Sequence, residues 1–271
     1  ASDVYKRQSK DCADDIKTDN LGNLIVFKKG KKSAKSKLMV SAHMDEVGLM
    51  VTDITSDGYL KFDEVGGIDR RVLPGKRVCV GRNGLNGVIG VKPIHLTNGD
   101  EKTAVPKMND MYIDIGAESR EDALKYVNYG DSINFEGDFK INGKTVVTKA
   151  LDDRFGCYVL INLIKSEPEY DMYFTFVVQE EVGLRGARPA AFTVNPDFAL
   201  VIESTTAADV AEVDASHQVC NLSKGATVTV MDRATVYDKE MISAAFELAE
   251  KNNIACLLYT SPSPRDISGS R

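Results

Sequence analysis

Three short apolar segments, each followed at once by ionisable residues, constrain the fold of this chain more than any other feature. The segments are Leu38–Ala42, Tyr173–Val178 and Phe198–Ile202. Short, continuous apolar runs of this kind are typical of buried strands. The residues that follow them are His43-Met44-Asp45-Glu46, Gln179-Glu180-Glu181 and Glu203. Because an open α/β sheet binds ligands beyond the carboxyl ends of its strands, these side chains are predicted to converge on one crevice.

The segments around these strands continue the α/β pattern. Leu24–Phe27 and Val47–Ile54 are predicted strands, and Arg154–Lys165 is a predicted helix. An amphipathic helix is expected to begin near Asp238, because apolar residues recur there at helical spacing. Between Gly67 and Val146 the pattern changes: apolar runs are short and Asn-Gly turns recur, which predicts a small β-rich domain.

These patterns predict a discontinuous α/β domain with an insertion. We assign residues 9–66 and 147–256 to an α/β domain with a mixed sheet and flanking helices, and 67–146 to the β-rich insertion domain. Residues 1–8 and 257–271 resemble translated sequencing-adaptor sequence, so we predict that both are non-native tails.

Composition excludes several classes of protein. The formal net charge of −6 gives no basic surface for nucleic acid. No run approaches the ~20 apolar residues of a membrane span, and no N-terminal stretch has a signal-peptide pattern. The five cysteines are scattered without CxxC spacing, which is typical of reduced thiols. A cytoplasmic protein is therefore expected.

Two acidic pairs allow both a structural and a functional interpretation. Asp152, just before a predicted helix, could serve as its N-cap. Glu180 and Glu181 could be solvated surface charge, but they directly follow an apolar run and should lie near the core. Burying several carboxylates together is unfavourable unless cations neutralise them. Histidine with carboxylates suits zinc, cobalt or manganese, and a carboxylate that is not a ligand can serve as general base.

Three motifs in this order resemble the M42 family of metallo-aminopeptidases, which includes glutamyl and tetrahedral aminopeptidases. The motifs are His43-Met44-Asp45-Glu46-Val47-Gly48, Lys149-Ala150-Leu151-Asp152-Asp153-Arg154 and Gln179-Glu180-Glu181-Val182-Gly183-Leu184-Arg185-Gly186-Ala187. Gly66-Gly67-Ile68-Asp69 and Gly90-Val91-Lys92-Pro93-Ile94-His95-Leu96 are similar to the insertion domain of that family. The resemblance covers roughly residues 10–256.

The resemblance implies a zinc-peptidase-like fold, peptide substrates and two divalent metal ions per subunit. It implies that His43 and Glu203 bind the first ion, Glu181 binds the second and Asp152 bridges both. It further implies that Glu180 is the general base and that Asp45 orients His43. Self-assembly through the insertion domain is also implied, with the dodecamer as the usual family form.

One departure from the family pattern affects the metal site. The family has a second histidine ligand far toward the C-terminus, and this chain ends before it. His95 and His217 are the other histidines, and we interpret the first as structural and the second as a surface residue. We therefore expect about one tightly bound metal ion and little activity in this chain.

Two other interpretations remain open. Paired carboxylates also hydrolyse glycosides, although a glycosidase needs carboxyl groups that face each other across the bond. Glu180 and Glu181 are adjacent, and His43 and Asp152 would have no role in that reaction. The other alternative is that the chain, without the last histidine, acts only as an assembly module. The preferred N-terminal residue and the metal cannot be inferred from the sequence.

Overall fold

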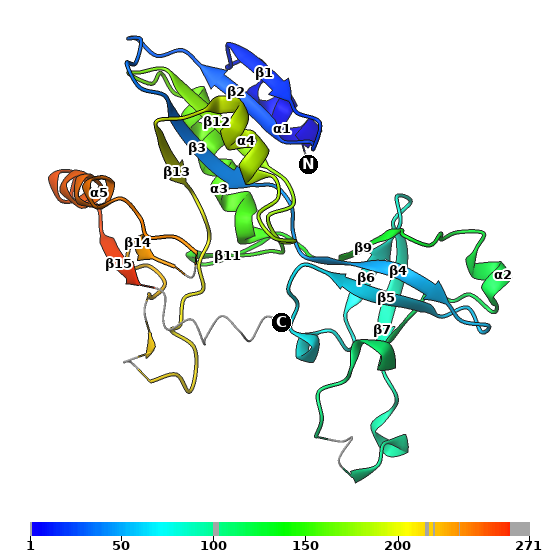
Figure 1. The fold of residues 1–271 in the computed structure, drawn as a ribbon. Helices are drawn as coiled ribbons and strands as arrows, with labels where there is room; N and C mark the ends of the chain where they lie inside the picture. The colour runs from blue at the N-terminus through cyan, green and yellow to red at the C-terminus, as the bar shows by residue number, and fades with distance from the viewer. Residues whose placement is uncertain (1, 100–102, 215–216, 219, 233, 261–271) are drawn as a thin grey trace. The chain divides into compact units, whose positions relative to one another are not determined.

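The computed structural model describes residues 2–99, 103–214, 217–218, 220–232 and 234–260 (Figure 1). The chain forms two compact units, residues 1–204 and 205–271, and each is described by itself.

A five-stranded mixed sheet organises the first unit. Its order is β1-β2-β12-β3-β13. The strands are β1 (Asp15–Thr18), β2 (Leu24–Lys28), β3 (Leu38–His43), β12 (Met172–Val177) and β13 (Phe198–Val201). Strands β3, β12 and β13 are parallel, whereas β2 is antiparallel to β12 and to β1. This arrangement confirms the expected mixed sheet.

Helices cover both faces of this sheet, which explains why its central strands are continuously apolar. On one face, Val40 and Phe174 belong to a core that includes Leu160 of α3 (Leu151–Lys165) and Tyr5 of α1 (Ser2–Ser9). On the other face, Met39 packs with Val194 of α4 (Ala187–Val194).

A closed six-stranded barrel forms the inserted β-rich domain, with strand order β4-β5-β8-β7-β6-β9. The strands are β4 (Gly48–Ile54), β5 (Leu60–Val65), β6 (Arg77–Val80), β7 (Leu85–Gly90), β8 (Tyr112–Asp114) and β9 (Ser132–Phe135). Its core is one cluster of alternating inward residues, such as Leu49, Val51, Val78 and Val80. The barrel includes β4 and β5, which precede the expected boundary at Gly66, because both strands pair only within the barrel.

Short elements complete the insertion. They are the 3-10 turns Arg70–Val72, Ile94–Leu96 and Met108–Asp110, helix α2 (Arg120–Ala123), and the hairpin of β10 (Lys140–Asn142) and β11 (Thr145–Val147). Ser119 caps α2, since its Oγ accepts from the backbone N–H of Asp122 at 3.2 Å.

The second unit is built on two parallel strands joined through a helix. These are β14 (Ala226–Met231), α5 (Lys239–Lys251) and β15 (Cys256–Thr260). Asp238 caps α5, because its carboxylate accepts from the backbone N–H of Met241 at 2.9 Å.

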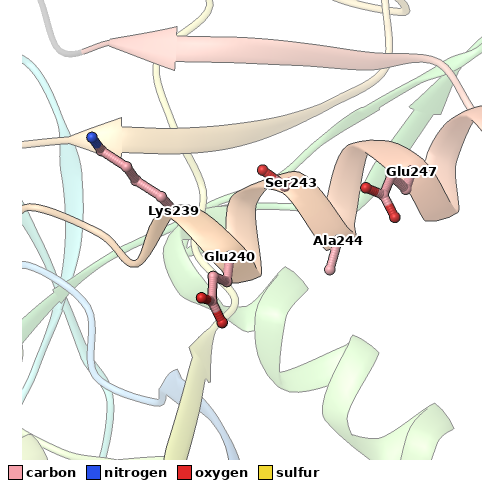
Figure 2. A pocket seen from close by; sticks show the side chains of 5 residues that line it. All are labelled: Lys239, Glu240, Ser243, Ala244 and Glu247. Carbon is pink, nitrogen blue, oxygen red and sulfur yellow. The ribbon is translucent and has the colours of Figure 1, made fainter.

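A hollow on this unit is lined by residues of α5 alone (Figure 2), namely Lys239, Glu240, Ser243, Ala244 and Glu247. A hollow lined by one helix is the surface of that helix and gives no sign of a binding site.

Two elements include residues that we assigned to tails. In α1, the ring of Tyr5 stacks on Phe176 with centroids 5.1 Å apart, and β15 includes residues 257–260. Secondary structure does not reveal the origin of a segment, so the tail assignment stays a prediction. Within the described residues, no helix has the length and apolarity needed to cross a membrane.

Candidate metal centre

The carboxyl ends of three parallel strands meet at one edge of the sheet. His43 is the last residue of β3 and lies opposite Val177, the last residue of β12. On the other side of β3, Val201 at the end of β13 lies opposite Ser41. The segments that carry Glu180, Glu181 and Glu203 therefore leave the sheet beside His43, as the sequence predicted.

His43 is the centre of this cluster and is only 2% exposed. Its Nε2 lies 2.9 Å from Asp152 Oδ1 and 3.5 Å from Glu203 Oε1. Its Nδ1 lies 3.1 Å from the backbone oxygen of Asp45 and 3.6 Å from the carboxylate of the same residue. Burial alone would lower the pKa of His43, but hydrogen bonds to Asp152, Asp45 and Glu203 together raise it.

Among the described residues, two groups of side chains bring enough ligand atoms together to be candidates for holding a metal ion. They are His43 with Glu180 and Glu181, and His43 with Asp153 and Glu203. The ligand atoms in each group lie within 4.8 Å of one another. Of the expected ligands, His43 belongs to both groups, Glu181 to the first and Glu203 to the second. Asp152 belongs to neither group, although it contacts His43 directly.

Asp152 and its neighbour Asp153 differ sharply in environment. The alternative role for Asp152 as an N-cap is wrong, since Asp152 and Asp153 both have non-helical backbone angles and the regular turns of α3 begin only at Arg154. The capping bond comes instead from Asp153, whose buried carboxylate accepts from the backbone N–H of Gly156 at 2.9 Å and of His43 at 3.2 Å. Burial, reinforced by the charge of Glu203, raises the pKa of Asp153 to about 7. The hydrogen bond to His43 lowers the pKa of Asp152.

Asp45 connects two of the strand ends. Its two carboxylate oxygens accept from the backbone N–H groups of Glu180 and Glu181, each at 3.1 Å. Burial alone would raise the pKa of Asp45, but the contact with His43 and these two N–H groups lower it. One carboxylate therefore holds both the imidazole and the segment that carries the two glutamates.

The electrostatics of the glutamates suit a bound cation. Burial raises the pKa of Glu180, and it raises the pKa of Glu181 to about 7 with help from the charges of Asp152 and Glu180. Half-buried carboxylates that repel one another are stabilised when a divalent ion lies between them. Imidazole and carboxylate together are donors that zinc, cobalt and manganese accept. The donor set therefore fits the metal chemistry expected from the sequence.

The two remaining histidines belong to neither candidate group within the described residues. Both side chains are exposed: His95 lies in the 3-10 turn Ile94–Leu96 of the insertion, and His217 lies in the second unit.

Two residues to which the sequence assigned no role of their own, Arg154 and Cys157, hold the end of β3. Arg154 Nε donates to the backbone oxygen of Met44 at 2.9 Å. Cys157 Sγ lies 3.0 Å from the backbone oxygen of His43. Both residues follow the Asp152-Asp153 pair along α3. The only sequence signal for their role is that they lie on the helix that begins at this motif.

Comparison with known proteins decides the family. A profile of the M42 glutamyl aminopeptidase family matches residues 22–264. The chain belongs to the M42 family. This confirms the resemblance carried by the three motifs, and the chain is accordingly an aminopeptidase of that family.

Individual M42 relatives agree in sequence and in fold. A putative aminopeptidase of Acetivibrio thermocellus is 44% identical over 247 residues, which is 90% of this chain and 72% of that protein. The structure of an aminopeptidase from Desulfurococcus kamchatkensis superposes with a TM-score of 0.89 at 33% identity, covering 95% of this chain and 73% of that one. The TET1 peptidase of Pyrococcus horikoshii, which can assemble into a tetrahedron or a large octahedral shell, superposes with a TM-score of 0.82 at 39% identity, covering 95% and 77%.

Proposed function

We propose that this chain removes N-terminal residues from peptides at a site that holds two divalent metal ions beside the ends of β3, β12 and β13. The observation that carries the proposal is the convergence of one buried imidazole with carboxylates from three strand ends. Zinc suits this donor set, and cobalt or manganese would also be accepted.

His43, Asp152 and Glu203 would hold one ion, and Asp152 and Glu181 would hold the other. We assign the shared position to Asp152 because its carboxylate faces Nε2 of His43 at 2.9 Å, on the side opposite to Asp45. The carboxylate of Asp153 is already engaged by two backbone N–H groups. Asp153 would then fix the loop, whereas Asp152 would bind metal.

The chemistry would be divided between the ions and the side chains. When bound, the ions would supply Lewis-acid chemistry, which lowers the pKa of water and polarises the peptide carbonyl. Glu180 would remove a proton from the attacking water and return it to the departing amine. Asp45 would orient the imidazole from its Nδ1 side, as carboxylates commonly do for histidine ligands.

A further part of the proposal concerns assembly and compartment. The TET1 relative forms closed shells, and we propose that this chain also self-associates, through its inserted barrel. All five cysteines are free thiols, which supports a reducing compartment such as the cytoplasm.

The test is hydrolysis of aminoacyl nitroanilides in the presence of excess Zn²⁺ or Co²⁺. Activity should disappear with a chelator and return when the metal is added back. A cellulose derivative should not be cleaved under either condition. Chelator-resistant cleavage of the cellulose derivative, with no cleavage of any nitroanilide, would refute the proposal and favour a glycosidase.

A further inference from the structure

We propose that Asn23 is a positioning residue that sets the geometry of the loop carrying Glu180 and Glu181. This loop, residues 178–186, is called the glutamate loop below. The inference rests on the proposed function, because Glu180 and Glu181 have their roles only there. It concerns a residue far from the three motifs in the sequence, on the turn before β2.

Asn23 joins the two ends of the glutamate loop. Its Oδ1 accepts from the backbone N–H of Val178 at 2.9 Å, and its Nδ2 donates to the backbone oxygen of Gly186 at 2.9 Å. The side chain is completely buried. A buried amide is costly unless its hydrogen bonds are made, so these bonds fix the separation of the two loop ends.

Asp19 in turn holds the amide of Asn23. One oxygen of Asp19 accepts from Asn23 Nδ2 at 2.7 Å, while the other accepts from the backbone N–H of Leu21, Gly22 and Asn23, each at 2.9 Å. The conformation of the turn from Asp19 to Asn23 is therefore fixed by bonds within the turn itself, apart from its bonds to the glutamate loop. With Nδ2 bound to Asp19 and to the backbone oxygen of Gly186, Oδ1 faces the backbone N–H of Val178.

The two ends of the loop approach so closely that only glycine fits at one of them. A Cβ on Gly186 would overlap the backbone oxygen of Val178 and lie 2.6 Å from Asn23 Oδ1. Within the loop, Gln179 and Leu184 have φ values of 58° and 59°, a region that costs non-glycine residues free energy. Such a conformation persists only where the surroundings enforce it, and Asn23 supplies that constraint at both ends.

Asp45 holds the same loop at its middle. Its carboxylate accepts the backbone N–H groups of Glu180 and Glu181, each at 3.1 Å. The loop is thus held at three places, twice by Asn23 and once by Asp45. Only Asp45 lies in a motif that carries ionisable residues, so the part played by Asn23 is visible only in the structure.

Only an amide side chain can both accept from the backbone N–H of Val178 and donate to the backbone oxygen of Gly186. An aspartate at this position would still accept from Val178 but would place an oxygen against the backbone oxygen of Gly186. The pair of changes Asn23→Asp and Asp19→Asn restores the bond between residues 19 and 23, because donor and acceptor are exchanged. It cannot restore the bond to Gly186. Asn23→Ala loses the bonds to both Asp19 and Gly186, so comparing it with the pair separates the effect on the turn from the effect on the loop.

The experiment measures loop motion and metal affinity in five proteins: the unchanged chain, Asn23→Ala, the pair Asn23→Asp with Asp19→Asn, Val78→Ala, and His43→Ala as a control that removes a proposed ligand. Val78 is buried in the barrel core, so its variant controls for a general loss of stability. Amide hydrogen exchange by mass spectrometry follows residues 178–186. Titration with Co²⁺, monitored by its visible absorption, gives the affinity of the site.

Both Asn23 variants should exchange the amides of the glutamate loop at least about tenfold faster and bind Co²⁺ about 10–100-fold more weakly, as is usual when a partner of a metal ligand is lost. Val78→Ala should leave both quantities unchanged. Loop exchange and Co²⁺ affinity that match Val78→Ala in both Asn23 variants would overturn the inference. If the loop loosens but Co²⁺ affinity is insensitive even to His43→Ala, the positioning role stands and the proposed metal site fails.

Discussion

The imidazole of His43 is buried among carboxylates that outnumber it. Asp45 and Asp152 contact its two nitrogens from opposite sides, and Glu203 lies 3.5 Å from Nε2. Glu180 and Glu181 add further negative charge and have raised pKa values, chiefly because they are partly buried. One imidazolium cannot balance this charge, which supports the proposed binding of a metal cation among these side chains.

The two adjacent glutamates should respond differently to the same change. Glu180→Gln should keep the metal affinity of the unchanged chain and lose about 10²–10⁴-fold in turnover, because it removes the proposed base. Glu181→Gln should weaken metal binding, because it removes a proposed ligand. Metal content after dialysis and nitroanilide turnover with excess Co²⁺ would be measured side by side. Turnover of Glu180→Gln close to that of the unchanged chain would exclude Glu180 as the base.

Residue types at strand ends made most of this site predictable. His43, Glu181 and Glu203 were expected there because each follows an apolar segment, and all three belong to the candidate groups. The segments before His43 and Glu181 are buried strands as expected, whereas the residues of β13, before Glu203, are exposed. The candidate role of Asp153 and the part played by Asn23 could not be inferred. Both depend on hydrogen bonds to backbone groups distant in the sequence, from His43 to Asp153 and from Asn23 to Gly186. Such bonds leave no periodic signal in the sequence.

At the scale of elements, strands and helices were predicted well where apolar residues form a continuous run or recur at helical spacing. The expected strand Tyr173–Val178 is β12, Met172–Val177, and the expected helix Arg154–Lys165 lies within α3. The extent of the barrel was harder to infer, since β4 alternates buried and exposed residues in a way that suits either domain. Only pairing with β5 and β9 assigns β4 to the barrel.

Gly66, just after β5, lies against Glu181 of the candidate metal site. It has φ +88°, and a Cβ there would lie 3.0 Å from Val47 Cγ1 and 3.2 Å from Glu181 Cβ. Gly75 has a similar φ of +80° but no atom within 4 Å of such a Cβ. Gly75→Ala should therefore cost about 1–2 kcal/mol, the usual penalty of the left-handed backbone. Gly66→Ala should cost more and also weaken metal binding, because the added methyl displaces Glu181.

Urea unfolding and Co²⁺ titration of the two alanine variants would check this expectation. Equal losses of stability, with equal affinity for Co²⁺, would mean that the contact between Gly66 and Glu181 carries no coupling.

At the scale of the whole molecule, the barrel supplies none of the proposed ligands, which leaves it free for assembly. Lys149 Nζ lies 3.0 Å from Glu46 Oε1, so the two chain segments that flank the barrel and hairpin are close together. Residues 48–147 could therefore be replaced by a short glycine-serine linker. We expect the shortened chain to form a smaller species than the unchanged chain in light scattering, while circular dichroism still reports the α/β sheet. A large assembly that survives the deletion would locate the contacts elsewhere.

The number of metal ions that the 271-residue chain retains is the last prediction. His43, Asp152 and Glu203 give the first position a nitrogen and two carboxylates, with room for water, as catalytic zinc sites commonly have. Within the described residues, no second histidine joins the candidate groups, so the other position has only Glu181 and the shared Asp152. Two carboxylates without an imidazole bind zinc or cobalt weakly.

After dialysis, elemental analysis should therefore find about one ion per chain, and none in His43→Ala. Peptidase activity should be low in the dialysed protein and should rise as free Co²⁺ is added, because the reaction needs both ions. Two ions retained per chain after dialysis would show that another side chain completes the second position.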